Sequence, residues 1–159
     1  MAVLKILTNP NPILRQKSQE ISKKDLSQKD MVIFCNSMIK AMKANDGVGL
    51  AAPQVGKNIR LIIVDTPEHG PTAMINPKII KKSWAREWGE EGCLSCPNVF
   101  GEVNRHKKVT CTFIKPDGKT SKVEAVALTA RAIQHEIDHL DGILFIDKAK
   151  NIKVILNDE

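Results

Sequence analysis

Two histidines four residues apart, His135 and His139, are the side chains of this sequence best suited to chemistry, and Glu136 directly follows the first. On an α-helix, which has about 3.6 residues per turn, positions 135 and 139 lie on the same face. Two imidazoles placed in this way can bind one metal ion. Glu136, turned by about 100°, can reach a water molecule beside the metal without binding the metal itself. An ordinary polar helix would show the same pattern, so a metal site needs a further ligand.

A third ligand is available in the segment EEGCLSCP, residues 90–97, which we expect to be a loop because glycine and proline flank it. A thiolate is a strong ligand for zinc or iron, so Cys93 can join His135 and His139. Three protein ligands leave a fourth position open for water, which is the arrangement of a catalytic site. Cys96 offers the alternative of a closed, structural four-ligand site. The separation between Cys96 and His135 is far longer than the roughly 12 residues of a C2H2 zinc finger, which favours the open site.

The segment GVGLAAPQVG, residues 47–56, is the third candidate for function. It follows a predicted helix and not a strand, and it lacks a third glycine at dinucleotide-binding spacing, which argues against a phosphate loop. Gly47 and Gly49 instead suit a backbone that another group approaches closely. The side-chain N–H of Gln54 is able to stabilise a developing oxyanion. On composition alone, however, Gln54 would be a surface residue.

Helical spacing identifies the elements that could position these residues. Met31, Cys35, Met38 and Met42 repeat at helical intervals and predict an N-terminal amphipathic helix that ends near Gly47. Ser27 and Asp30 form a candidate capping box for this helix. Ile133, Ile137 and Leu140 predict a second helix, which carries the two histidines and is stopped by Gly142.

The middle of the chain favours strands. NIRLIIVD (58–65), TAMINPKIIKK (72–82, interrupted near Pro77) and KVTCTFI (108–114) are rich in β-branched residues, and residues 108–128 predict a hairpin. The order of helix, strands and helix indicates an α+β fold with an antiparallel sheet. We expect antiparallel β-sheets packed around a central metal-binding helix, with the amphipathic helix at the N-terminal end. Cys35 and Cys111 lie within apolar patterns, so we expect them to be buried thiols.

Length and composition predict a single domain spanning residues 1–159. The hydrophobic fraction of 42% excludes a disordered chain, and four cysteines are too few for a disulfide scaffold of this size. The N-terminal residues lack a signal peptide, and no apolar run approaches the roughly 20 residues of a membrane span. We therefore expect a cytoplasmic protein with no membrane partner.

The charge balance is basic, with a formal net charge of +6. The basic residues are spread along the chain in short pairs, such as Lys81-Lys82 and Lys107-Lys108. We expect these pairs to be solvated surface without interleaved aromatic residues, and we predict no specific DNA partner.

Taken together, the segments GVGLAAPQVG, EGCLS and QHEIDHLDG resemble the three signature motifs of the peptide deformylase family, in the same order and at comparable separations. PNPILRQKSQEI is similar to that family's opening segment, and LDGILFID is similar to the stretch after its metal helix. The resemblance extends to about residue 148. Three motifs in order are far more specific than any one of them.

The resemblance implies a metal-dependent hydrolase that removes the formyl group from N-formylmethionine at the start of new polypeptides and releases formate. It implies Glu136 as the general acid and base, and Gln54 with the backbone N–H of Leu94 as the groups that hold the formyl oxygen. It also implies three metal ligands and a peptide-binding segment, which are Cys93, His135 and His139 for the metal, and Gly47, Val48 and Gly49 for the peptide.

The resemblance implies one divalent ion per chain, iron(II) in the cell, whereas a Cys/His/His site also suits zinc, nickel or cobalt. Two features depart from the family pattern. Cys96 stands where the family usually has an aliphatic residue, and the segment after Gly142 is short and resembles a strand or tail. Many bacterial members carry a long helix there that docks on the ribosome. We therefore expect ribosome association, if it occurs, to use another surface.

Three alternatives stay open. A zincin-like metallopeptidase also uses the His-Glu-x-x-His pattern, but its third ligand lies downstream, where only terminal acids such as Asp158 and Glu159 are available. A non-catalytic, zinc-stabilised ribosome- or RNA-associated module would close the metal with Cys96 as a fourth ligand. The third alternative is a member of the same family with an altered preference for the first side chain of the substrate.

Overall fold

The computed structural model describes residues 3–26 and 29–156. Two short helices, the 3-10 helix Pro12–Arg15 and α1 (Lys23–Leu26), precede the longer helix α2 (Lys29–Ala44). The elements that follow are β1 (Gly49–Ala51), the 3-10 helix Ala52–Val55, β2 (Leu61–Thr66), β3 (Gly70–Lys82), β4 (Arg86–Cys93), β5 (Cys96–His106), β6 (Lys108–Ile114), β7 (Thr120–Val126), α3 (Ala127–Leu140), the 3-10 helix Phe145–Asp147 and β8 (Lys150–Val154).

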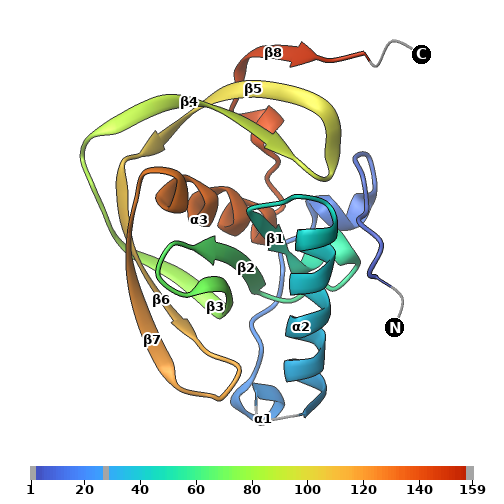
Figure 1. Cartoon of the computed structure of the whole chain (residues 1–159), viewed down its shortest axis with the longest axis vertical. Coiled ribbons are helices and arrows are strands. Elements are labelled where there is room, and N and C mark those ends of the chain that lie inside the picture. Colours follow the sequence, from blue (N-terminus) through green and yellow to red (C-terminus); the bar gives the residue numbers. More distant parts are fainter. Residues whose placement is uncertain (1–2, 27–28, 157–159) are drawn as a thin grey trace.

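The strands form two antiparallel sheets, with α3 between them (Figure 1). One sheet has the order β1-β2-β3-β6-β7, and the other has the order β4-β5-β8. The hairpin predicted over residues 108–128 is confirmed as β6 and β7, which pair from Lys108 opposite Val126 to Ile114 opposite Thr120. The predicted mixture of few helices with antiparallel sheets is confirmed.

Helix α3 uses its apolar side to pack against the five-stranded sheet. Ile133 and Leu140 are fully buried in one cluster with residues of β2 and β3, including Ile62 and Met74. This packing leaves the side of α3 that carries the two histidines directed away from the cluster and towards β4 and β5. Gly142 follows the helix with φ +74°, a conformation that favours glycine and ends the helix as predicted.

Helix α2 packs against the other side of the same sheet. Cys35, Met38 and Met42 are buried on it, in a cluster that includes Leu50 and Ile63. The methionine spacing is therefore explained by core packing and not by an exposed binding surface. Cys35 and Cys111 are both buried, as predicted. The capping box proposed for Ser27 and Asp30 depends on Ser27, which lies outside the described residues.

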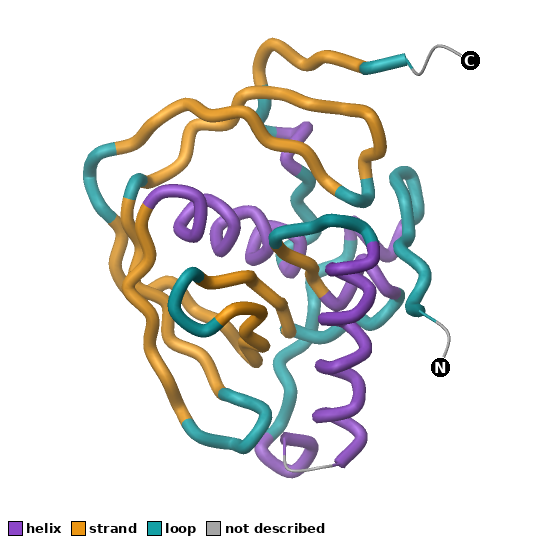
Figure 2. Tube along the Cα trace, viewed as in Figure 1, coloured by secondary structure: helices purple, strands orange, loops and turns teal. Residues whose placement is uncertain are grey.

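The expectation of a loop over residues 90–97 was wrong. This segment is the end of β4, a short turn and the start of β5, and Cys93 is paired in register with Cys96 across the turn. Figure 2 shows the two strands as long continuous segments that arch over α3. The side chains of β4 are mostly exposed, so this strand lacks the alternation of apolar and polar residues by which a strand is identified.

The strand around Pro77 is continuous, although its pairing is irregular. β3 runs from Gly70 to Lys82, and its register with β6 shifts between Ile75 and Lys78. Asn76 has φ +48° at this point. Such a shift accommodates proline, which has no N–H to donate to a neighbouring strand.

Among the described residues, no helix combines the length and the apolar character that crossing a membrane requires.

Candidate active site

The structure brings Cys93, His135 and His139 together from two elements. Cys93 ends β4, and both histidines lie on α3, where their ring centroids are 5.1 Å apart. One potential ligand atom from each of the three residues lies within 4.8 Å of the other two, and Cys93 Sγ is 3.2 Å from His139 Nε2. Ligand atoms around a tetrahedral zinc ion are separated by about 3.3–3.6 Å, so a small inward adjustment would let this group hold one cation.

The ring of His135 is oriented by a buried carboxylate that the sequence analysis did not identify. His135 Nδ1 lies 2.8 Å from Glu91 Oε1, which leaves Nε2 free for the cation. Arg105 contacts Glu91 with two hydrogen bonds of 2.9 Å each, and Arg131 contacts it at 2.7 Å. Partners of this kind fix the orientation and the tautomer of a metal-binding histidine.

The electrostatics of this cluster keep Glu91 ionised. Burial alone would raise the pKa of Glu91, but the hydrogen bonds from Arg105 and His135 outweigh it and hold the pKa well below its ordinary value. Arg105 extends the cluster further, because its Nη1 lies 2.5 Å from Asp138 Oδ2. The support of His135 is therefore a chain of paired charges and not a single contact.

Protonation of the three candidate ligands opposes cation binding at low pH. Burial lowers the pKa of His135, but the hydrogen bond to Glu91 outweighs it and the net pKa is raised. Burial holds the pKa of His139 well below its ordinary value, so this ring is neutral. The neighbouring Cys96 thiol, together with burial, raises the pKa of Cys93, so its proton must leave when a cation binds.

Glu136 lies beside this group and is almost fully buried. Its Oε2 has no hydrogen-bond partner within the described part of the chain, and burial raises the pKa of its carboxyl to about 7. A cation at the three ligands would lower this pKa again. A Cβ atom added to Gly49 would lie only 2.5 Å from Glu136 Oε1, so the glycine makes room for the carboxylate. The close approach that was expected at Gly49 is therefore made by the side chain of Glu136.

Gln54 is buried, in contrast to its expected surface position on composition alone. Its Oε1 accepts a hydrogen bond from the backbone N–H of Ala51 at 2.9 Å. Its Nε2 donates to Ser95 Oγ at 3.0 Å and lies 3.5 Å from Cys93 Sγ. The amide is thus held with its N–H groups towards the candidate ligands. Ser95 was not predicted as a site residue, because no local pattern distinguishes it from an ordinary serine in a turn.

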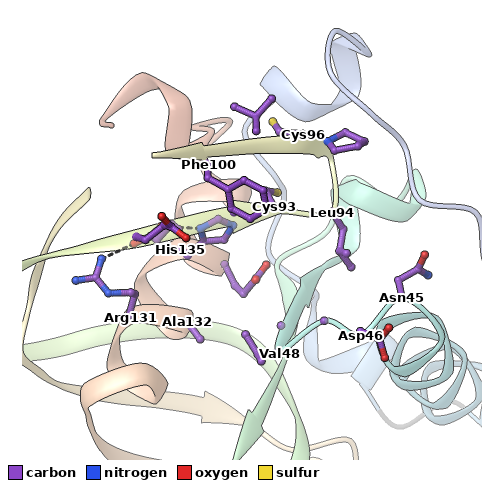
Figure 3. A pocket seen from close by; sticks show the side chains of 18 of the residues that line it. Asn45, Asp46, Val48, Cys93, Leu94, Cys96, Phe100, Arg131, Ala132 and His135 are labelled. Atoms are coloured by element: carbon purple, nitrogen blue, oxygen red, sulfur yellow. Dashed lines mark hydrogen bonds and ion pairs between the residues drawn. The ribbon is translucent and has the colours of Figure 1, made fainter. Parts of the chain in front are cut away.

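These residues open onto a cavity of about 610 Å³. Figure 3 shows Cys93 and His135 on its wall, with Arg131 towards one end and Asn45 and Asp46 towards the other. Gly47, Val48, Gly49 and Leu94 also line it, and Val48 is half exposed. β1 is an edge strand of its sheet, and β4 is an edge strand of the other. The cavity therefore lies between two strand edges.

Cys96 is outside the group of candidate ligands. It is buried in a separate apolar cluster with Leu14, Val103, Leu144 and Phe145. Cys93 packs against the edge of that cluster, so the two thiols are neighbours. The described residues contain one group of potential metal ligands, and Cys96 is not a member of it. Cys96 is therefore not among the side chains that the structure places to hold a cation.

Comparison with known proteins identifies the family. The model of the polypeptide deformylase family matches residues 3–154. The chain belongs to the peptide deformylase family. It is therefore a deformylase, an enzyme that removes N-formyl groups, and the predicted resemblance is confirmed.

Individual relatives match over nearly their whole length. The peptide deformylase of Halothermothrix orenii is 47% identical over 156 residues, which cover 96% of this chain and 97% of the relative. That of Desulforudis audaxviator is 43% identical over 152 residues, which cover 96% and 97%.

Solved deformylases share the fold. A class I type b peptide deformylase from Acinetobacter baumannii superposes with a TM-score of 0.90 and 35% identity, covering 93% of this chain and 100% of that one. A peptide deformylase from Synechococcus elongatus in complex with actinonin gives a TM-score of 0.86 and 38% identity, covering 93% and 79%.

Proposed function

We propose that this deformylase acts on N-formylmethionyl peptides of new proteins, releases formate, and uses one divalent cation held by Cys93, His135 and His139. The observation that carries the proposal is the convergence of these three side chains beside Glu136, at the wall of a cavity large enough for a peptide end. α3 would then be the central metal-binding helix of the fold. We further propose that residues 1–159 form one domain and that the enzyme works in the cytoplasm.

The donor set fits a divalent metal. One thiolate and two imidazoles suit iron(II), zinc, nickel or cobalt, and the family resemblance favours iron(II) in the cell. A bound cation would supply Lewis acidity, which polarises the formyl carbonyl and makes a water molecule more acidic.

Glu136 is proposed to move the proton. Its buried, unpartnered Oε2 is placed to accept a proton from the attacking water. The same carboxyl then passes this proton to the amine that leaves as the C–N bond breaks. Its burial supports the role, because a desolvated carboxylate without a hydrogen-bond partner holds a proton more readily than one in water.

Gln54 and the backbone N–H of Leu94 are proposed to hold the formyl oxygen as it gains negative charge. Gln54 is suited to this because Ala51 and Ser95 fix its amide before any substrate binds. A donor that is already oriented costs no reorganisation at the moment of reaction. Leu94 follows Cys93 in the turn between β4 and β5, which puts its backbone next to the proposed cation.

The peptide is proposed to bind as an added strand along Gly47, Val48 and Gly49. An extended peptide can pair with a free sheet edge, and main-chain hydrogen bonds then supply affinity that does not depend on sequence. This mode suits an enzyme that meets many different N-terminal sequences. The preference for the first side chain would be set by the cavity wall near Leu94 and Leu128.

The decisive experiment measures formate release from formyl-Met-Ala-Ser, with metal content determined on the same anaerobically prepared sample. We expect one equivalent of metal per chain and activity that is lost with a chelator and restored by iron(II). A casein-type substrate with blocked ends serves as the control for the zincin alternative. Cleavage of casein without formate release would overturn the proposed substrate, and a metal held by four protein ligands would support the non-catalytic alternative.

A further inference from the structure

A second cavity, of about 410 Å³, uses residues of α3 that the candidate active site does not use. Its wall includes Lys81, Lys82, Arg86, His106, Gln134 and Lys148, and we name it the basic hollow. It shares no lining residue with the cavity beside Cys93. The established deformylase activity does not account for it.

The positive charge of the basic hollow is only partly neutralised by the described residues. Lys81, Lys82 and Arg86 are exposed and form no ion pair with any carboxylate of residues 3–26 or 29–156. Asp138 is the one carboxylate that lines the hollow, and it is already engaged by Arg105 at 2.5 Å and by Lys148 at 3.0 Å. Cations that converge on a concavity without partners attract an anionic ligand.

An almost completely exposed tryptophan lies in the chain segment that joins two of these cations, outside the wall of the hollow itself. Trp84 lies in the chain between Lys82 and Arg86, and 98% of its surface is accessible. A tryptophan that is buried contributes a large apolar surface to folding, and Trp84 contributes almost none. The prediction that no aromatic residue lies among the basic pairs was wrong, because Trp84 and Trp88 lie two and six residues after Lys82.

The loop that carries Trp84 is held in place by its neighbours. His106 Nδ1 lies 2.7 Å from the Ser83 carbonyl oxygen, and the backbone N–H of Lys108 donates to Ser83 Oγ at 3.1 Å. The backbone N–H of Lys107 donates to the Ala85 carbonyl at 3.0 Å. The indole is therefore presented on an anchored backbone, which also brings the Lys107-Lys108 pair next to the Lys81-Lys82 pair.

We propose that the basic hollow and Trp84 together bind single-stranded nucleic acid, with phosphates at Lys81, Lys82 and Arg86 and a base stacked on Trp84. Unpaired cations beside an exposed aromatic ring are the combination that binds single strands without reading sequence. A free phosphate or a phosphopeptide would use the cations but would leave the indole without a partner. The wall is also polar, because the Gln134 amide bonds both backbone groups of His106, and this does not suit a membrane surface.

The test measures binding of the full-length enzyme to fluorescein-labelled RNA and DNA 12-mers of the same sequence, by anisotropy and by quenching of tryptophan fluorescence. We expect K81E/K82E to weaken binding at least tenfold at low salt and to reduce the slope of log K against log salt by about 1.4, since each phosphate contact contributes about 0.7. W84A should weaken binding about tenfold and abolish most of the quenching.

The matched control is K40E/K43E on α2, which changes the net charge equally on exposed positions away from the hollow. All three variants should retain deformylase activity, which also shows that they are folded. Tighter binding of RNA than of DNA would support a contact to the 2′-hydroxyl, and equal binding would support recognition of backbone and base. Loss of binding in the control to the same degree, unchanged binding in W84A, absence of binding, or preference for phosphatidylserine vesicles would each overturn the proposal.

Discussion

The buried charges around His135 are matched one to another, whereas the exposed cations Lys81 and Lys82 of the basic hollow have no partner among the described residues. Glu91 and Arg105 are paired within 2.9 Å, and each has a further partner in Arg131 or Asp138. Lys81 and Lys82 have no such partner in the part of the chain that the structure describes. Burial explains the difference, because an unpaired charge is very costly inside a protein and nearly free in water.

Substitution of the two thiols that flank the β4–β5 turn should have the largest effect. Cys93→Ser should lose both the metal and the activity, because a serine hydroxyl is a poor ligand at neutral pH. Cys96→Ser should keep both, since Cys96 packs in an apolar cluster. Metal analysis and formate release on the two variants provide the measurement. Loss of the metal in Cys96→Ser alone would contradict the open site.

Glu136→Gln should lower turnover by about 10³- to 10⁴-fold while the metal is retained, because the amide cannot accept the proton. Metal content and kcat on the same preparation separate this effect from loss of the cation. The control is Glu124→Gln, an exposed residue of β7 outside both cavities, which should behave as the wild type. Substantial activity in Glu136→Gln would refute the assigned role.

Glu91→Gln tests the paired side of the comparison directly. It leaves Arg105 and Arg131 short of a buried partner, so we expect a loss of about 3–5 kcal/mol in the free energy of unfolding. Metal affinity should fall by about 10- to 100-fold, because His135 loses the group that orients it. Lys82→Gln at the basic hollow is the matched control and should leave both quantities unchanged. Equal effects of the two substitutions on the free energy of unfolding would contradict the claim that the buried charge pairs of Glu91 stabilise the fold.

The pH dependence of this stability has a definite sign. The folded-state pKa of Glu91 lies below its unfolded value, so its contribution is complete above the unfolded pKa and is lost as the pH falls through the folded one. The difference in unfolding free energy between the wild type and Glu91→Gln should therefore narrow in acid. Urea titrations at neutral pH and near pH 3 would measure it.

Gln54→Ala should reduce kcat by about a hundredfold, since one preorganised oxyanion donor contributes roughly this much. KM for formyl-Met-Ala-Ser should change much less, because the contact strengthens mainly in the transition state. Ser95→Ala, which frees the Gln54 amide on one side, should show a smaller reduction. An unaltered kcat in Gln54→Ala would remove this residue from the mechanism.

Metal affinity should fall by about tenfold for each unit by which the pH is lowered, for each proton that the cation displaces. The raised pKa of Cys93 and the raised pKa of His135 both place these protons on the metal-free protein, so acid opposes binding. Competition with a coloured chelator for cobalt(II) between pH 6 and 8 would give the slope. An affinity independent of pH would contradict this assignment.

Periodicity in the sequence predicted α3 because its apolar residues lie on one side and its polar residues on the other, and it predicted the β6–β7 hairpin because β6 alternates buried and less buried residues. It did not predict β4, because the inward side of this strand carries Gly89, Glu91 and Cys93 in place of a row of large apolar residues. The metal group was predictable because His135, His139 and Cys93 are rare residue types at distinctive spacing. Glu91 and Arg105 were not, because a pairing between distant charged residues leaves no local pattern.

The contact between Gly49 and Glu136 has a consequence for inhibition. Any side chain at position 49 would collide with the carboxylate that is proposed to move the proton. The same glycine lines the groove along which a peptide-shaped inhibitor would lie. We therefore expect that resistance to such an inhibitor does not arise by substitution of Gly49, because a side chain that blocked inhibitor binding would also displace Glu136 and abolish activity.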